Sequence, residues 1–193
     1  LAYLIYTSGS TGTPKGVGTT NSNVCNLALM ASFCKTGGEI STLQLAPIAF
    51  DAATFEIWTA FLNGGRLVVA NPGRLELNNV TETIKKFNVN TLWLTSGLFT
   101  TAVDNAISLF EPTEQLLTGG DIVSIESVKK LLHKYPKIQV INGYGPTETT
   151  TFACCHSIQN FDLNNIALPI GSPLKNTQLY ILDAALEPVP HGV

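Results

Sequence analysis

Short apolar runs alternate with amphipathic stretches along most of this chain, and this alternation restricts the fold more than any other feature. Seven runs have the length and composition of strands: Leu1–Tyr6, Thr42–Ala46, Arg66–Ala70, Thr91–Thr95, Gln115–Leu117, Ile138–Ile141 and Gln178–Leu182. Five stretches between them have helical periodicity: Asn21–Phe33, Ala52–Leu62, Val80–Phe87, Leu98–Leu109 and Ile125–His133. The pattern predicts βαβ units and an α/β fold whose parallel-rich sheet is layered with helices.

Local signals support individual boundaries in this pattern. Gly64 and Gly65 stand where a helix stops before a strand, and Asn79 with Glu82 three residues later resembles a capping box. From about Asn160 the sequence is irregular, so we expect residues 160–193 to begin a separate β-rich segment. In parallel sheets ligands bind beyond the carboxyl ends of the strands, so the loops at that edge are the expected sites of chemistry.

Composition excludes several classes of function. The chain has 193 residues, of which 45% are hydrophobic and only 13% charged, with a net charge of −3. There is no cationic surface of the kind that a nucleic acid backbone requires, and no apolar run of membrane-spanning length. The spacing of the four cysteines does not suggest a metal site, and we expect buried, reduced thiols in a cytoplasmic protein.

The stretch "YTSGSTGTPKG" (6–16) follows the first apolar run directly. Glycines permit tight turns, and backbone N–H groups, hydroxyls and the Lys15 ammonium together suit an anion such as phosphate. A Walker A loop is excluded, because Lys15 follows Pro14 and precedes Gly16 rather than a hydroxyl residue. The residues alone leave two interpretations open, a phosphate site and a plain flexible loop.

A second motif, "NGYGPTETT" (142–150), follows another strand candidate. The ring of Tyr144 could lie flat against a base or serve only in packing. Thr147 and Glu148 place a hydroxyl and a carboxylate at the carboxyl end of a strand, where they suit Mg²⁺ and phosphate oxygens. The alternative is a turn with one solvated glutamate.

Asp51 is a lone carboxylate between apolar neighbours at the start of a helix candidate, in "AFDAATFEIW" (49–58). One interpretation is an N-cap, since aspartate is common at that position. The other is a charge that pairs with a cationic group of a ligand inside an apolar pocket. The sequence alone does not decide between them.

Five segments in this order and at these spacings resemble the adenylation domain of nonribosomal peptide synthetases: "YTSGSTGTPKG", "FDAATFEIW", "LLTGGD", "NGYGPTETT" and "IGSPLKNTQLYILD". The resemblance covers essentially the whole chain. A broader superfamily, which includes acyl-CoA synthetases and firefly luciferase, shares the first and fourth segments more than the others. The resemblance implies part of the large N-terminal subdomain of an adenylate-forming enzyme.

The resemblance implies that the chain binds ATP and Mg²⁺ and catalyses formation of an aminoacyl adenylate with release of pyrophosphate. Phosphate and nucleotide contacts would fall on Thr7, Ser8, Gly9, Ser10, Thr11, Gly12, Lys15, Gly120, Asn142, Tyr144, Gly145 and Thr147, with Tyr144 stacked on adenine. Lys15, Thr147 and Glu148 would act in catalysis, and Glu148 would hold the metal. Asp51 would pair with the α-ammonium of an amino acid.

The resemblance also implies a side-chain pocket. Its members would be Phe50, Asp51, Ala52, Phe55, Trp93, Leu117, Gly119, Gly143, Thr151 and Phe152. The large members are apolar and the two glycines leave moderate room, a pattern that looks like the family's valine-type pockets. Isoleucine and leucine are the nearest competitors, because one methylene changes binding in an apolar pocket by only about 1–3 kcal/mol.

Some family features are absent from this chain. Asn21 stands where the family usually has a histidine, and the family's ribose-binding motif and C-terminal catalytic lysine lie beyond Val193. We therefore expect residues 1–193 to be a partial adenylation domain, truncated at both ends and inactive alone. The complete protein would include a carrier domain bearing phosphopantetheine. An acyl-CoA synthetase-like ligase and a non-catalytic nucleotide-binding relative remain as alternatives.

Overall fold

The computed structural model describes residues 1–8, 12–29, 39–73, 75–158, 163–164, 166–190 and 192. Its strands are β1 (Tyr3–Thr7), β2 (Lys15–Thr19), β3 (Ser41–Gln44), β4 (Arg66–Val69), β5 (Thr91–Thr95), β6 (Gln115–Gly119), β7 (Gln139–Tyr144), β8 (Cys154–Ser157) and β9 (Ser172–Pro173). Its helices are α1 (Asn21–Leu29), α2 (Ala52–Leu62), α3 (Leu77–Lys86), α4 (Ser96–Ala106) and α5 (Ile125–Lys134), with short 3₁₀ turns η1 (Ile107–Phe110) and η2 (Thr147–Thr149).

Seven strands form one sheet in the order β4-β3-β5-β6-β7-β8-β9. The first five of these run parallel to their neighbours, whereas β8 and β9 are antiparallel. The five parallel strands correspond to five of the strands that the sequence predicts, and a helix lies between most of them along the chain. The predicted α/β class with a parallel-rich sheet is confirmed.

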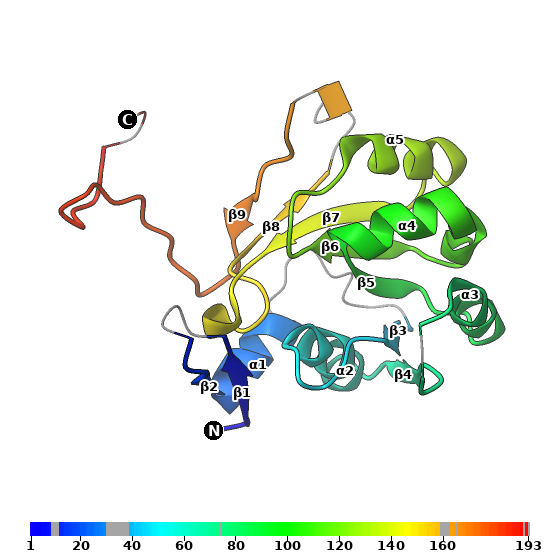
Figure 1. Cartoon of the computed structure of the whole chain (residues 1–193), viewed down its shortest axis with the longest axis horizontal. Coiled ribbons are helices and arrows are strands. Elements are labelled where there is room, and N and C mark those ends of the chain that lie inside the picture. Colours follow the sequence, from blue (N-terminus) through cyan, green and yellow to red (C-terminus); the bar gives the residue numbers. More distant parts are fainter. Residues whose placement is uncertain are drawn as a thin grey trace.

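Strict alternation of side chains along the central strands explains why helices cover both faces of this sheet. Leu92 and Leu94 of β5 belong to the apolar core shared with α3, α4 and α5, whereas Trp93 between them belongs to a second core shared with α1 and α2. Leu116 and Leu117 of β6 divide in the same way. Figure 1 shows α4 and α5 on one side of the sheet, and α1 and α2 on the other.

Two helices begin at hydroxyl residues that accept the hydrogen bond of a helix N-cap. Thr95 Oγ1 accepts from the backbone N–H of Leu98 at 3.3 Å, and Ser124 Oγ accepts from that of Ser127 at 3.2 Å. Thr95 is also the last residue of β5, so α4 begins immediately where the strand ends. The start of α4 is therefore fixed at the carboxyl edge of the sheet.

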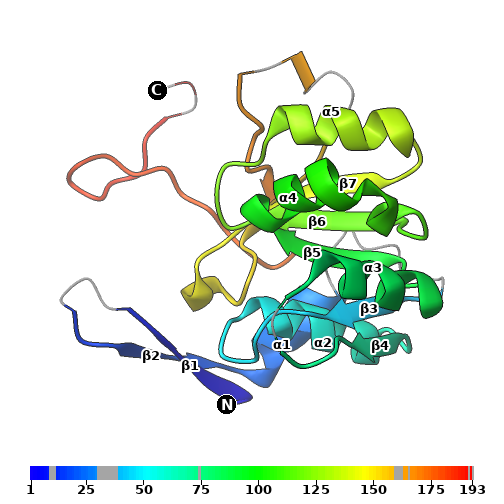
Figure 2. The same cartoon turned by 45° about the vertical axis from the view of Figure 1, so that its right-hand side comes forward.

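The first predicted strand does not join the parallel sheet. Instead β1 pairs antiparallel with β2, from Tyr3 opposite Thr19 to Thr7 opposite Lys15. Figure 2 shows this hairpin set apart from the main sheet. Its second strand was not predicted, because "KGVGT" carries two glycines in five residues and lacks the composition of a strand. The described ends of the phosphate-loop candidate therefore belong to two paired strands, with Thr7 ending β1 and Lys15 beginning β2.

Other boundaries differ from the expectations. The range Gln178–Leu182 is not a strand, and most of it is exposed in a run that leaves the body of the molecule (Figures 1 and 2). Helix α3 begins at Leu77 after Glu76, so Asn79 lies inside the helix and is not its N-cap. The part of the expected helix Asn21–Phe33 beyond Leu29 lies outside the described residues.

Candidate active site

The loops that carry the predicted site residues lie together at one edge of the sheet. Strands β3, β5, β6 and β7 are parallel neighbours, so their carboxyl ends meet at the same edge. The segment 45–51 follows β3, Gly120 follows β6, and Tyr144 ends β7 immediately before η2. Residues separated by almost a hundred positions in the sequence thereby line one region.

Asp51 occupies the residue before α2, but its carboxylate does not act as the cap of that helix. The backbone at Asp51 is helical, with φ −65° and ψ −19°, and the side chain makes no capping hydrogen bond. Burial raises the pKa of the Asp51 carboxyl above its ordinary value, and a hydrogen bond with the side chain of Thr147 opposes that shift. The structure thus joins the residue expected to bind an ammonium group to the residue expected to contact the α-phosphate.

Thr151 holds the backbone at Asp51. The Thr151 hydroxyl donates a hydrogen bond of 2.7 Å to the carbonyl oxygen of Asp51. Thr150 and Thr151 both have left-handed backbone conformations, with φ of 63° and 67°. Such conformations are costly for β-branched residues and persist only where the surrounding structure imposes them. The turn after η2 is therefore shaped to bring Thr151 against the start of α2.

The large apolar residues predicted for the side-chain pocket form one cluster. The ring of Phe152 packs edge-on against Phe55, with centroids 5.5 Å apart, and against Trp93, with centroids 5.1 Å apart. Leu117 belongs to the same cluster, and all four side chains are buried. Elements α2, β5 and β6 and the segment before β8 therefore bring together residues that the sequence places a hundred positions apart.

The two glycines of the predicted pocket permit close packing. A Cβ atom at Gly143 would lie 2.6 Å from the Phe152 ring, and one at Gly119 would lie 2.0 Å from the carbonyl oxygen of Gly143. Any larger residue at either position would have to displace these neighbours. The space beside Gly143 is thus occupied by the ring of Phe152, which itself belongs to the predicted pocket.

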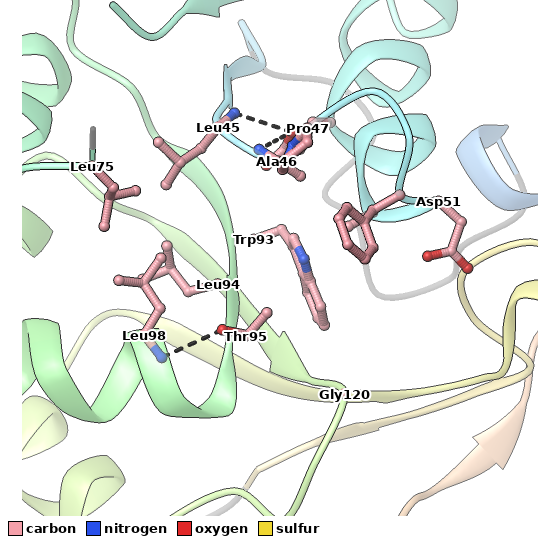
Figure 3. A pocket seen from close by; sticks show the side chains of 13 residues that line it. Leu45, Ala46, Pro47, Asp51, Leu75, Trp93, Leu94, Thr95, Leu98 and Gly120 are labelled. Carbon is pink, nitrogen blue, oxygen red and sulfur yellow. Dashed lines mark hydrogen bonds between the residues drawn. The ribbon is translucent and has the colours of Figure 1, made fainter. Parts of the chain in front are cut away.

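A cavity of about 410 Å³ opens beside Asp51 and Trp93 (Figure 3). The predicted pocket residues Phe50 and Ala52 also line it. Gly120, predicted as a nucleotide contact, lies in the same wall. The remaining wall is mostly apolar and was not predicted: Leu45, Ala46, Pro47, Glu56, Leu75, Leu94, Thr95 and Leu98. Such a cavity suits an apolar group that carries a charge near Asp51.

A second cavity, of about 440 Å³, lies beyond the carboxyl ends of β6 and β7 and shares Gly120 with the first. Its wall contains the predicted nucleotide contacts Asn142, Tyr144 and Gly145. Half of the Tyr144 side chain is exposed, so its ring is available for stacking, whereas the Asn142 amide donates to the carbonyl of Pro169 at 2.8 Å. Gly120 lies in the wall of both cavities.

The β1–β2 hairpin lies against this region through the contact of β2 with η2, the turn that contains Thr147 and Glu148 (Figure 2). Lys15 is exposed at the start of β2, and its backbone carbonyl accepts a 3.5 Å hydrogen bond from the Thr7 hydroxyl. Ser8 and Gly12 are exposed on either side of the hairpin tip. The predicted site residues Gly9, Ser10 and Thr11 lie outside the described residues.

Comparison with known proteins decides the family. The profile of the AMP-binding enzymes matches residues 1–193. The chain belongs to this family.

Relatives of this AMP-binding chain are large peptide synthetases. It is 46% identical over 193 residues to linear gramicidin synthase subunits C and B from Brevibacillus parabrevis, and 38% identical over 194 residues to malpibaldin synthetase from Mortierella alpina. These matches cover 100% of this chain but only 2%, 4% and 4% of the relatives. The chain therefore spans a small part of the length of the proteins it resembles.

Solved structures agree on both the family and the fold. A nonribosomal peptide synthetase protein containing adenylation and PCP domains, PA1221, superimposes with a TM-score of 0.93 at 39% identity, over 97% of this chain and 38% of that one. The Klebsiella oxytoca NpsA N-terminal subdomain in complex with 3-hydroxyanthranilyl-AMSN gives 0.88 at 29% identity, over 98% and 49%. The AMP-binding chain thus has the fold of the N-terminal subdomain of adenylation domains, and the expected resemblance is confirmed.

Glu56 is the residue of this AMP-binding fold that sequence reasoning missed. Its side chain is buried, and burial raises the pKa of its carboxyl to about 8, opposed by hydrogen bonds from the backbone amides of Ala46 and Leu45. One signal was present in the sequence, because Glu56 is the single charged residue of the apolar helix "AATFEIWTAFL". A buried ionisable group needs hydrogen-bond partners, so the position of Glu56 indicated contacts with nearby polar groups.

The described residues contain neither a cluster of potential metal ligands nor a helix that could span a membrane. No group of three or more His, Cys, Asp or Glu side chains in the described ranges could hold a metal ion. Glu148 is an exposed single carboxylate in η2, which fits a cation that takes most of its ligands from phosphate oxygens and water. No helix in the described part of the chain has the length and apolar character needed to cross a membrane.

Proposed function

We propose that this AMP-binding chain belongs to an enzyme that activates an amino acid as an aminoacyl adenylate, with release of pyrophosphate from ATP. The observation that carries the proposal is the position of Asp51. Asp51 lines a mostly apolar cavity, and its carboxylate makes no helix cap but accepts a hydrogen bond from Thr147; an ammonium group would supply the opposite charge that stabilises a partly buried carboxylate. A fatty acyl substrate would have no such group to pair.

The nucleotide is expected to occupy the cavity beyond β6 and β7. Tyr144 supplies a half-exposed ring for stacking on adenine, and Gly120, Asn142 and Gly145 form nearby wall. Thr147 would contact the α-phosphate, since its side chain already lies within hydrogen-bonding reach of Asp51. The substrate carboxylate and the α-phosphorus would then meet close to Gly120, which lines both cavities.

The phosphates that leave as pyrophosphate are expected to bind at the hairpin tip. Lys15 would neutralise their charge, and Thr7, Ser8, Gly9, Ser10, Thr11 and Gly12 would supply hydroxyl and backbone donors. Glu148 would hold Mg²⁺, which neutralises phosphate charge when bound.

Positioning and electrostatics would supply most of the catalysis. The substrate carboxylate attacks the α-phosphorus in line, the new C–O–P bond forms and the bond to the pyrophosphate oxygen breaks. Lys15 and the hairpin donors stabilise the negative charge that moves to the leaving pyrophosphate. No covalent bond to the protein is required.

Valine, or a similar branched aliphatic amino acid, is the substrate that the apolar cluster favours. Phe55, Trp93, Leu117 and Phe152 offer no charge to a polar side chain, and the ring of Trp93, which lies in the cavity wall, limits the size of the group that fits. The relatives named as gramicidin synthase subunits support a role in peptide synthesis. A solved relative that contains adenylation and PCP domains supports a carrier domain as the partner that receives the amino acid on its phosphopantetheine.

Intact-protein mass spectrometry of the carrier domain tests this proposal. The full-length protein is incubated with Mg²⁺, ATP and an equal mixture of amino acids, and the mass added to the carrier domain is measured. We expect the addition of one valine, or of isoleucine or leucine, only when ATP is present. Addition of a fatty acyl group from a parallel acid mixture, with none from amino acids, would contradict the proposal.

A further inference from the structure

Glu56 is the second carboxylate in the wall of the cavity beside Asp51. It is only 1% exposed, and it lies on α2 five residues after Asp51. Among the described residues that line this cavity, Asp51 and Glu56 are the ionisable ones. Asp51 has a role in the proposed function, whereas that function leaves Glu56 without one.

The Glu56 carboxylate accepts hydrogen bonds from two consecutive backbone N–H groups. Leu45 donates to Oε2 at 3.1 Å, and Ala46 donates to Oε2 at 3.0 Å and to Oε1 at 3.2 Å. Figure 3 shows both donors at the top of the cavity. Strand β3 ends at Gln44, one residue earlier, so these N–H groups lie where the sheet no longer provides partners. The Glu56 carboxylate thus accepts the hydrogen bonds that a neighbouring strand would accept if β3 continued.

Further hydrogen bonds fix the same loop and the base of the Glu56 side chain. The Thr42 hydroxyl of β3 donates to the backbone carbonyl of Glu56 at 2.7 Å, so both the backbone and the side chain of Glu56 contact β3 or the residues after it. Within the loop, the N–H of Phe50 donates to the carbonyl of Pro47 at 2.9 Å. The loop from 45 to 50 is therefore tied to α2 at one end and turns tightly before Asp51 at the other.

We propose that Glu56 is a positioning residue that holds the loop between β3 and α2, and through it sets the place of Asp51 in the amino-acid site. The inference rests on the proposed function, because it assumes that Asp51 binds the substrate ammonium. Glu56 does not contact the ammonium in this account. It replaces strand pairing at a point where the chain leaves the sheet to form the wall of the cavity.

Two substitutions separate this role from simple packing. Glu56→Gln keeps a carbonyl oxygen that can accept from both Leu45 and Ala46, as Oε2 does now. Glu56→Met keeps a similar length but leaves both N–H groups without the acceptor. Thr59→Val serves as the matched control, since Thr59 is 1% exposed on the same helix and does not line the cavity.

The experiment measures KM for the amino acid and KM for ATP in pyrophosphate exchange, in the full-length protein and its variants. We expect Glu56→Met to raise the amino acid KM about tenfold or more while the ATP KM stays within about threefold, and Glu56→Gln and Thr59→Val to resemble wild type. Equal changes in both KM values, or none in a folded Met variant, would overturn the inference. If the Met variant does not fold, the Gln variant decides. A folded Gln variant whose amino acid KM is about tenfold higher than that of the wild type overturns the inference, and a Gln variant with wild-type KM values supports it.

The wild-type protein distinguishes the two proposals in the same assay. If the wild type catalyses exchange with at least one amino acid and the Glu56→Met variant has wild-type KM values, only the proposed role of Glu56 is contradicted. No exchange with any amino acid in the wild type would contradict the proposed function and the inference that depends on it.

Discussion

The hydroxyl of Thr151 donates a 2.7 Å hydrogen bond to the backbone carbonyl of Asp51, across 100 residues of sequence. This bond links the turn after β7 to the start of α2. The first of these segments carries Thr147 and Glu148, and the second carries Asp51. The position of the proposed ammonium ligand is therefore coupled to the loop that is expected to contact phosphate.

Replacing Thr151 by valine tests this coupling. Valine is also β-branched, so the left-handed backbone at this position costs the same while the hydroxyl is lost. One hydrogen bond contributes about 1 kcal/mol, so we expect the amino acid KM to rise about 3- to 10-fold. Steady-state exchange kinetics measure the change. Thr101→Val is the control, because the Thr101 hydroxyl bonds only to a carbonyl within α4; an equal effect at both positions would contradict the coupling.

Asp51→Asn should remove the partner of the substrate ammonium while keeping the shape of the side chain. Loss of one member of a partly buried charge pair typically costs about 2–5 kcal/mol, so we expect the amino acid KM to rise about 30-fold or more. The affinity for ATP, measured by titration calorimetry, should be nearly unchanged. Asp104→Asn, which removes only a surface ion pair with Lys130, is the matched control. Amino acid binding that survives in the Asp51 variant would show that the carboxylate has another role.

Gly143→Ala tests the packing of the apolar cluster. The added Cβ would lie 2.6 Å from the Phe152 ring, so we expect a loss of about 1–3 kcal/mol in the free energy of unfolding, measured by urea denaturation. Gly97→Ala is the control, since no atom lies within 4 Å of its Cβ, and it should be neutral or slightly stabilising.

A double variant makes this test specific. Adding Phe152→Leu to Gly143→Ala frees the space beside the new methyl group, so the combined loss should be smaller than the sum of the two single losses. Strictly additive losses would mean that the ring and the glycine do not constrain one another.

The buried carboxyl of Glu56 predicts a pH dependence of stability. Its pKa rises from 4.5 to about 8 in the folded state, so between these values the folded state binds more protons than the unfolded state. The contribution of Glu56 to the free energy of unfolding should therefore be greatest below about pH 4.5. It should fall by up to a few kcal/mol as the pH rises toward 8. Glu56→Gln should flatten this part of the curve of unfolding free energy against pH. An unchanged slope would place the titration on another group.

The sequence predicted the parts of the fold that periodicity controls. Apolar runs indicated the five parallel strands, and the central strands β5 and β6 contribute side chains to the apolar cores on both faces of the sheet. It missed β8 and β9, because "CCHS" and "SP" have little β-propensity and form strands only by pairing with β7 and with each other. The run Gln178–Leu182 has the composition of a strand but joins neither of the two sheets.

The same limit applies to the site. Asp51, Tyr144 and Thr147 lie at or after the carboxyl ends of strands that the sequence predicted, whereas their roles in binding stay predictions. The bond between Thr151 and Asp51 depends on how a left-handed turn folds back, and no local pattern encodes that contact. Glu56 carried a local signal, a charge inside an apolar helix, but its two backbone partners lie in a loop that only the tertiary structure brings close.

The most direct test of the account is amino-acid-dependent exchange of labelled pyrophosphate into ATP by the full-length protein, with each proteinogenic amino acid in turn. The account predicts strong exchange with valine and weaker exchange with isoleucine or leucine, because the wall of the cavity is mostly apolar apart from Asp51 and the buried Glu56. Strong exchange with a polar or charged amino acid alone would contradict the assignment of the pocket. Exchange with none of them would contradict the central claim that this site activates an amino acid.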